Sequence, residues 1–213
     1  SGVVGVKGAS LVRVGDDSVA KYPGLTISGG TFTQDNFIVI KVDRGTFYLK
    51  EDGTLNSKNS YAVENWKFAE IKGGTVNGTV AAWTYSGGTV NGNVLSVNYG
   101  SAEGKVAKVS ITGGTVNGAL DTRSYDPSTN ELTSIDDATK ATIAVTGGTF
   151  SSDPTKYVVE DSAINKNDDG TFGVAKAYLA KVGDTSYYTM DEAFKAQTAS
   201  SEAIVLLRDY TTG

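Results

Sequence analysis

The hexapeptide Gly-Gly-Thr-Val-Asn-Gly is the sequence feature that most constrains the fold of this chain. It occurs intact three times, at Gly73–Gly78, Gly87–Gly92 and Gly113–Gly118. The shortened form Gly-Gly-Thr-Phe occurs at Gly29–Phe32 and Gly147–Phe150. A motif that recurs in this way builds architecture rather than one active site, so we expect the sequence to say more about the scaffold than about a ligand.

Apolar residues alternate before each copy of the motif. The pairs that precede Gly-Gly are Leu25 and Ile27, Ala69 and Ile71, Trp83 and Tyr85, Val109 and Ile111, and Ile143 and Val145. Alternation turns one face of a short strand inward, whereas Gly-Gly and Asn-Gly allow the backbone to turn. The repeated unit predicts an all-β solenoid with Trp83 and Tyr85 in its core. A series of Asn-Gly hairpins is the alternative, although Thr-Val is very short for a hairpin arm.

Stacked turns of a solenoid would place like residues over like. We therefore expect Asn77, Asn91 and Asn117 to form an asparagine ladder at one corner. The threonines of the same three copies should align beside them; these are Thr75, Thr89 and Thr115.

The spacing of the copies is irregular. A degenerate copy fits at Ile40–Phe47, and with it the intervals between copies are 15, 29, 14, 26 and 34 residues. The long intervals are compatible with one turn plus a loop, and the polar segments Lys50–Tyr61, Tyr99–Lys105 and Asp121–Lys140 are the predicted loops. The intervals of 14 and 15 residues leave two interpretations open: the turns are small there, or neighbouring copies occupy different sides of one turn.

Both ends of the repeat region have their own strand signals. Val-rich runs at Val3–Val6 and Leu11–Val14 predict one or two short N-terminal strands. After Phe150, the tight turn at Asn167–Gly170 and the apolar run Thr171–Val174 predict a hairpin that ends the solenoid.

Residues 177–213 form a different unit. Gly183-Asp184 predicts a hairpin, Thr189 to Glu192 is a capping-box pattern ahead of an amphipathic run, and Ala203–Leu207 is an apolar strand. We therefore predict a solenoid domain over residues 1–176 and a strand–strand–helix–strand unit over residues 177–213. That unit either caps the solenoid or begins a further module.

Composition excludes several classes of chemistry. The chain has neither His nor Cys, so it lacks the commonest general base, the usual zinc ligands and disulfides. The net charge of −5, with acids and bases interspersed, provides no basic stripe for nucleic acid. No apolar run approaches the roughly 20 residues of a membrane span.

We expect neither a cofactor nor a metal. The sequence Asn165-x-Asn167-x-Asp169-Gly170 is similar to the start of an EF-hand calcium loop. Lys176 stands where that loop needs a bidentate Glu. A hairpin turn is therefore the favoured interpretation.

Three sequences resemble the β-helix repeat modules of large cell-surface proteins of gut and other Gram-positive bacteria. They are Ile-Ser-Gly-Gly-Thr-Phe at 27–32, Val-Thr-Gly-Gly-Thr-Phe-Ser-Ser-Asp-Pro at 145–154 and Lys-Asn-Asp-Asp-Gly-Thr-Phe at 166–172. The tail from Ala180 to Tyr210 is similar to the segment that opens another such module. The resemblance implies a right-handed parallel β-helix with irregular turns, located outside a bacterium or on its surface, and cut from a longer exported protein. It implies little about function.

Trp66 and Phe68 are the candidate ligand-binding residues. If Ala69 and Ile71 point inward, these two aromatic side chains fall on the outer face of the chain. An exposed aromatic strip suits a sugar ring or a partner protein. The alternative is that a loop or the N-terminal strands cover it.

Two functions remain open from the sequence. The first is a non-enzymatic structural or adhesion module of a bacterial surface protein, which displays loops to an extracellular glycan or to a host or bacterial surface protein. The second is a carbohydrate-active β-helix enzyme, a glycoside hydrolase or polysaccharide lyase that uses carboxylates alone, for example Asp121 with Asp126. We assign no catalytic residue from the sequence.

Overall fold

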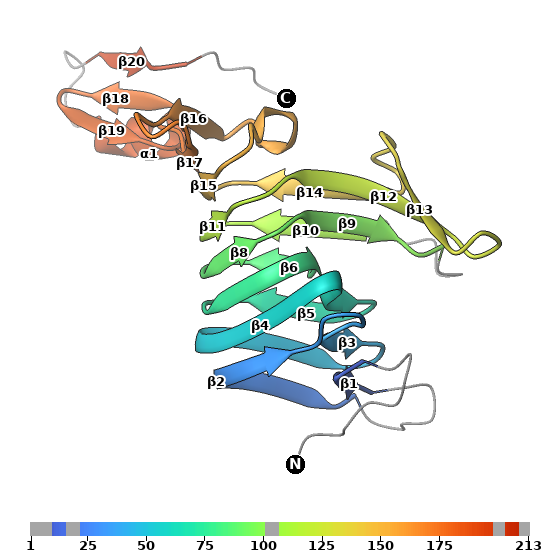
Figure 1. Cartoon of the computed structure of the whole chain (residues 1–213). Coiled ribbons are helices and arrows are strands. Elements are labelled where there is room, and N and C mark those ends of the chain that lie inside the picture. Colours follow the sequence, from blue (N-terminus) through green and yellow to red (C-terminus); the bar gives the residue numbers. More distant parts are fainter. Residues whose placement is uncertain (1–9, 16–21, 101–106, 198–202, 209–213) are drawn as a thin grey trace.

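Strands stack turn upon turn along most of this chain (Figure 1). The computed structural model describes residues 10–15, 22–100, 107–197 and 203–208. Within these ranges the fold is predominantly β, with a 17-stranded, mostly parallel sheet and a separate 3-stranded antiparallel sheet. No helix in this part of the chain has the length and apolar character needed to cross a membrane.

Each turn contributes strands to three sides of the large sheet. The first side holds the start of β2 (Gly24–Thr33), the start of β4 (Thr46–Asn65), β5 (Phe68–Ile71), β7 (Thr84–Tyr85), β10 (Ala107–Ile111) and β14 (Ala141–Val145). The second side holds the end of β2, the middle of β4, the start of β6 (Thr75–Ala81), β8 (Thr89–Asn91), β11 (Thr115–Val116) and β15 (Gly148–Phe150). The third side holds β1 (Val12–Val14), β3 (Ile40–Val42), the ends of β4 and β6, β9 (Val94–Asn98) and β12 (Leu120–Asp126).

These side-by-side strands pair in parallel, so the Asn-Gly pairs lie at corners of the stacked turns and not in hairpins. The apolar residue inside each motif points to the core, where Val76, Val90 and Val116 lie in register and are buried. Burying each such side chain stabilises the fold by roughly 1.5–3 kcal/mol. The alternation read from the sequence therefore produces one continuous core down the stack.

The predicted asparagine ladder is present at the corner that follows the second side. The side-chain amide of Asn117 donates to Oδ1 of Asn91 at 2.9 Å, and that of Asn91 donates to Asn77 at 2.7 Å. The ladder continues beyond the prediction, because Asn77 donates to Asn56 at 2.7 Å and Asn56 donates to the Thr33 hydroxyl at 3.0 Å. The predicted threonine column is also confirmed and extends over Thr31, Thr54, Thr75, Thr89, Thr115 and Thr149.

Two glycines of the motif are required by the close approach of successive turns. Gly88 has a φ of +75°, and a Cβ there would lie 2.5 Å from the Gly73 carbonyl oxygen. At the final position of the same copy, a Cβ on Gly92 would lie 2.2 Å from the Gly78 carbonyl oxygen. A side chain at either position would push backbone against backbone, so the motif fixes the packing of one turn on the next.

The short interval between motif copies is one complete small turn. Thr75-Val76-Asn77 of β6 pairs in parallel with Thr89-Val90-Asn91 of β8. These copies occupy the same side, and 14 residues separate the ladder positions Asn77 and Asn91. The interpretation that neighbouring copies occupy different sides is therefore wrong here.

The degenerate copy predicted at Ile40–Phe47 is wrong in register. Ile40 and Val42 belong to the third side, where they pair with β1 and with the end of β4. The true counterparts of Leu25 and Ile27 are Phe47 and Leu49 in β4. Alternation alone could not distinguish these sides, since both bury every second residue.

The predicted loop at Lys50–Tyr61 is also wrong, because all of it lies within β4. Gly53 and Thr54 pair with Gly30 and Thr31, so this segment is a copy of the motif in which Asp52 replaces the first glycine. Leu55 fills the core in this turn, and Asn56 joins the ladder. The polar composition reflects outward side chains of a wall strand.

The prediction for Tyr85 is confirmed, whereas the prediction for Trp83 is wrong. Tyr85 is buried, but Trp83 is 39% exposed. The small turn encloses little core, and the Tyr85 ring fills it and accepts a hydrogen bond from the Ala82 amide at 3.1 Å. A second large aromatic side chain is therefore directed outward at this corner.

The long interval around Asp121–Lys140 contains a projecting hairpin. β12 pairs with β9 in the wall and then continues as an antiparallel hairpin with β13 (Glu131–Ser134). The hairpin extends well beyond the stack (Figure 1). The last five residues of the predicted loop at Tyr99–Lys105 lie outside the described ranges. The predicted strand Val3–Val6 lies outside them as well. The strand predicted at Leu11–Val14 is present as β1.

The parallel stacking ends after β15 and the short 3-10 helix η1 (Thr155–Tyr157). β17 (Phe172–Lys176) pairs antiparallel with both β15 and β16 (Ser162–Lys166), as the predicted terminal hairpin requires. Antiparallel pairing at this position stops the addition of further parallel turns on the second side.

The tail has the predicted strand–strand–helix–strand order. It comprises β18 (Ala180–Val182), β19 (Thr185–Tyr187), α1 (Met190–Ala196) and β20 (Ile204–Leu206). Thr189 and Glu192 form the predicted capping box. Arg208 connects this unit to the end of the large sheet, since its guanidinium donates to the Glu160 carbonyl at 2.8 Å and to Asp161 at 2.9 Å.

Candidate binding face

The outer surface of the third side carries a second apolar cluster. Ala81, Leu95 and Val97 are buried although they point away from the main core. Partly buried side chains from a corner, a loop and the hairpin pack over them; these are Tyr61, Tyr99, Tyr125 and Leu132. β9 is consequently covered on both faces, which explains why Val94, Leu95, Ser96 and Val97 are all buried. We call this outer surface the hairpin face.

Trp66 lies at the rim of the hairpin face. Its ring is 46% exposed and stacks on Tyr99 with a centroid distance of 5.0 Å and an interplanar angle of 29°. The indole Nε1 donates to Oε1 of Glu64 at 2.9 Å, and Lys41 Nζ lies 5.3 Å from the ring centroid. These contacts hold the indole in one orientation while part of it remains open to solvent.

Phe68 is half-buried and has different partners. It begins β5 on the first side, where its ring lies 5.6 Å from that of Tyr48 in a tilted arrangement. Lys72 Nζ lies 5.0 Å from the Tyr48 ring centroid. Trp66 and Phe68 are therefore parts of two aromatic pairs, with Trp66 beside the hairpin face and Phe68 on the first side.

Two tyrosine hydroxyls and a carboxylate are buried beneath the hairpin face. The hydroxyls of Tyr61 and Tyr99 are buried close to each other, and Glu64, which neighbours both, is only 8% exposed. Burial, followed by the negative charge of Glu64, raises the pKa of Tyr61 to about 12. The same two causes, in the same order, raise the pKa of Tyr99. Both phenols therefore keep their protons to higher pH than an exposed tyrosine would.

A groove of about 590 Å³ lies beside this cluster, along the corner between the second and third sides. It is lined by residues 58–61, 78–79 and 92–93, which come from three successive turns, together with Leu95, Arg123 and Leu132. The final glycines of two motif copies, Gly78 and Gly92, form part of its wall. The groove thus runs across the stacked turns, and its size falls within the usual range for small-molecule sites.

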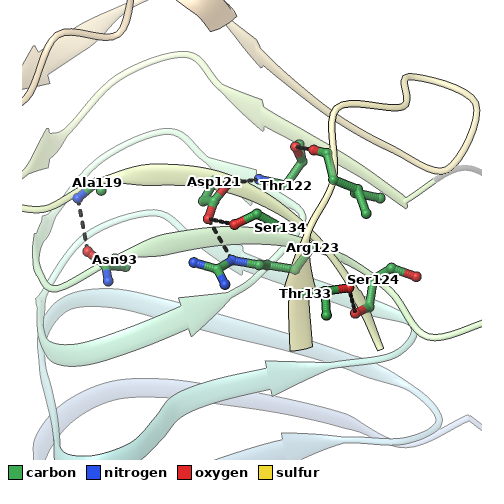
Figure 2. A network of polar contacts seen from close by, with 9 residues as sticks. Asn93, Ala119, Asp121, Thr122, Arg123, Ser124, Thr133 and Ser134 are labelled. Atoms are coloured by element: carbon green, nitrogen blue, oxygen red, sulfur yellow. Dashed lines mark hydrogen bonds and ion pairs between the residues drawn. The ribbon is translucent and has the colours of Figure 1, made fainter. Parts of the chain in front are cut away.

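Arg123 is fixed in the groove wall by Asp121 (Figure 2). Its Nε lies 2.6 Å from Oδ2 of Asp121. Asp121 is positioned in turn by the Ser134 hydroxyl, which donates at 3.0 Å, and by the Thr122 amide, which donates at 2.8 Å. Thr122 also anchors the returning strand, since its hydroxyl donates to the Ile135 carbonyl at 2.5 Å.

The structure does not bring Asp121 and Asp126 together as a catalytic pair. Both lie in the continuous strand β12, five positions apart, which corresponds to about 16 Å along the strand. They also point to opposite faces, because the separation is odd. Asp126 accepts hydrogen bonds from the Ser128 amide and hydroxyl at 2.8 and 2.7 Å, and these bonds lower its pKa. Glycosidases place their two carboxylates roughly 5–10 Å apart.

The EF-hand-like sequence forms a hairpin turn, as its composition predicts. Asp169 accepts from the Thr171 amide at 2.9 Å and from its hydroxyl at 2.6 Å, and Gly170 has a φ of +83°. Within the described ranges, no group of three or more acidic side chains is placed to hold a metal ion.

Sequence reasoning missed the groove, Arg123 and the two buried tyrosines. Their positions come from the corners of different turns, and no local spacing links them. The available signal was the final glycine of each motif copy, which marks a corner where successive turns pack backbone against backbone. Comparison with protein-family models, with curated proteins and with solved structures finds no match to this chain.

Proposed function

We propose that this chain is a non-enzymatic adhesion module, a right-handed parallel β-helix that belongs to an extracellular or surface protein of a bacterium and presents its hairpin face to a glycan. The observation that carries the proposal is the β12–β13 hairpin, which projects from the stack and packs Tyr125 and Leu132 over the cluster beside Trp66. Aromatic rings that are held in place and partly exposed suit the flat faces of sugars.

The ladder supports a display role because it ties the turns together. Four consecutive side-chain hydrogen bonds run from Asn117 to Thr33 along the stack. Such a scaffold holds the hairpin face in a fixed shape and reduces the entropy that ordering would cost on binding.

The alternative, a carbohydrate-active enzyme that uses carboxylates alone, is less well supported. Asp121 is occupied by Arg123 and Ser134, and Asp126 is used in the turn at the hairpin tip. Neither is free to face the other across a bound sugar.

A glycan array combined with a reducing-sugar release assay tests the proposal. We expect binding to at least one glycan class and no release of sugar. Trp66→Ala should weaken this binding, whereas Trp83→Ala, which removes a similarly exposed indole from another corner, should leave it unchanged. Sugar release by the wild type that is lost in Asp121→Asn would overturn the proposal in favour of the enzyme. Absence of binding to every glycan would also contradict it.

A further inference from the structure

The groove beside the hairpin face has a distinct electrostatic character. Arg123 and Lys58 are the charged residues among its lining side chains, although the chain as a whole has a net charge of −5. Lys58 comes from the second turn and Arg123 from the later strand β12, so the two cations belong to different turns of the stack. Asp121 pairs with Arg123, so the positive charge that this concave site offers to an anionic ligand comes from Lys58 and from the outer nitrogens of Arg123.

Arg123 is arranged to offer its outer nitrogens to that ligand. Asp121 pairs with the guanidinium through Nε as an ion pair at 2.6 Å, and Nε–H makes no aligned hydrogen bond. Among the described residues, no protein group accepts a hydrogen bond from the two Nη groups. Figure 2 shows the guanidinium beneath the Asp121 carboxylate, with its end pointing in the direction of Asn93, and Asn93 also lines the groove. Two parallel N–H groups in this arrangement match the two oxygens of a carboxylate.

The rest of the lining matches a sugar ring. Leu132 and the body of Tyr61 supply apolar surface, and Ser60 supplies a hydroxyl, with the Nδ2 of Asn93 and the Oδ1 of Asn59 as amide groups beside it. Mixed walls of this kind bind the apolar faces and the hydroxyl edges of a saccharide at once. The lining residues belong to corners of stacked turns about 4.8 Å apart, so the site is elongated along the axis.

We propose that this groove binds a saccharide that carries a carboxylate, with Arg123 as the carboxylate-binding residue and Lys58 as a second cation. The inference rests on the proposed function, because it assumes that the ligand is a glycan. It adds the chemical class of the sugar and the residues that select it. Asp121 is the positioning residue, since it fixes the orientation of the guanidinium.

Calorimetric titration with matched acidic and neutral oligosaccharides tests the inference. The probes are 3′-sialyllactose against lactose and trigalacturonate against galactotriose. We expect at least one acidic probe to bind about tenfold or more tightly than its neutral partner, as expected for a charge-assisted hydrogen bond. This preference should weaken as the salt concentration rises.

Arg123→Gln should abolish the preference, and Arg123→Lys should restore only part of it, because an ammonium cannot form the paired contact. Since Arg123→Gln also releases Asp121, Lys58→Ala serves as a second variant that leaves the ion pair intact and should reduce acidic binding several-fold. Lys108→Ala removes an exposed cation from the first side and should change nothing. Circular dichroism verifies the fold of each variant.

The outcomes separate the two proposals. If neutral and acidic sugars bind equally, or if Arg123→Gln keeps the preference, the inference is wrong while the adhesion proposal stands. If a hexaglutamate peptide binds through Arg123 and no sugar does, the groove is a site for acidic peptides and both proposals fall. If an acidic sugar binds through Arg123 but Trp66→Ala has no effect, the inference stands and the role of Trp66 is wrong.

Discussion

Gly88→Ala should destabilise this protein far more than a left-handed glycine normally would. Gly88 has a φ of +75°, and Gly170, in the turn between β16 and β17, has a φ of +83°. An alanine at either position incurs a similar backbone strain of about 1 kcal/mol. The two sites differ in their surroundings, because a Cβ at Gly170 meets nothing within 4 Å. Gly170→Ala is therefore the matched control.

At Gly88 the added Cβ would lie 2.5 Å from the Gly73 carbonyl oxygen and 2.8 Å from that of Gly74. Both atoms are backbone, so the strain is relieved only by moving one turn away from the other. This movement stretches the hydrogen bond from the Thr89 amide to the Gly74 carbonyl, now 2.9 Å. Overpacking costs about 1–3 kcal/mol and a lost hydrogen bond about 1 kcal/mol. With the backbone strain, the total is about 3–5 kcal/mol.

Equilibrium unfolding in urea, followed by circular dichroism, measures both variants. We expect the free energy of unfolding to fall by about 1 kcal/mol in Gly170→Ala and by about 3–5 kcal/mol in Gly88→Ala. Hydrogen exchange locates the loss, which should centre on β6, β8 and β11 because each turn contacts only its neighbours. Equal destabilisation by the two substitutions would refute the reasoning that turn-to-turn contact requires this glycine.

Three further predictions concern the ladder, the buried phenol and the tail. Asn91→Ala removes two ladder hydrogen bonds and Asn117→Ala only one, so urea unfolding should show about twice the loss of stability for Asn91→Ala, at about 0.5–1.5 kcal/mol per bond; equal losses would contradict this. Because the pKa of Tyr61 rises from 10.0 to about 12 on folding, its stabilising contribution is complete below pH 10 and is lost between pH 10 and 12, by up to about 2 kcal/mol. Tyr61→Phe should therefore show a shallower decline in urea titrations across this range, and an unchanged slope would argue against burial of the hydroxyl. Arg208→Ala should speed amide exchange in β20 and leave exchange in β8 unaffected. Unchanged protection of β20 would mean that the hydrogen bonds from Arg208 to Glu160 and Asp161 do not hold the tail.

The repeat was predictable from the sequence because its physics is local. An inward valine flanked by outward threonine and asparagine specifies both the core and the ladder, as Thr89-Val90-Asn91 shows. The prediction failed in a turn that keeps the structural role of the motif but has different residues at its glycine positions. In the second turn, Asp52-Gly53 replaces Gly-Gly, and the polar outward residues of this wall strand give it the composition of a loop.

The candidate site was predictable only in part because it depends on turn length. Trp66 was expected on the outer face, and it lies there. Its partner Tyr99 arrives two turns later, and the stacking of the two rings depends on how many residues each intervening turn contains. Arg123 similarly becomes part of a groove only through corners contributed by Gly78 and Gly92. Alternation determines which way a side chain points but not which distant residue it meets.

The ladder has a direction. Every amide from Asn117 to Asn56 donates toward the N-terminal turns, so the dipoles of its side chains add rather than cancel. At one extremity the chain of hydrogen bonds ends on the Thr33 hydroxyl. At the other it begins with Asn117, whose side-chain carbonyl oxygen forms the acceptor end. The two extremities therefore attract opposite partners, a negative or accepting group near Thr33 and a donor near Asn117. A β-sheet, whose own dipole is small, thereby gains a polarity like that of a helix, carried entirely by its side chains.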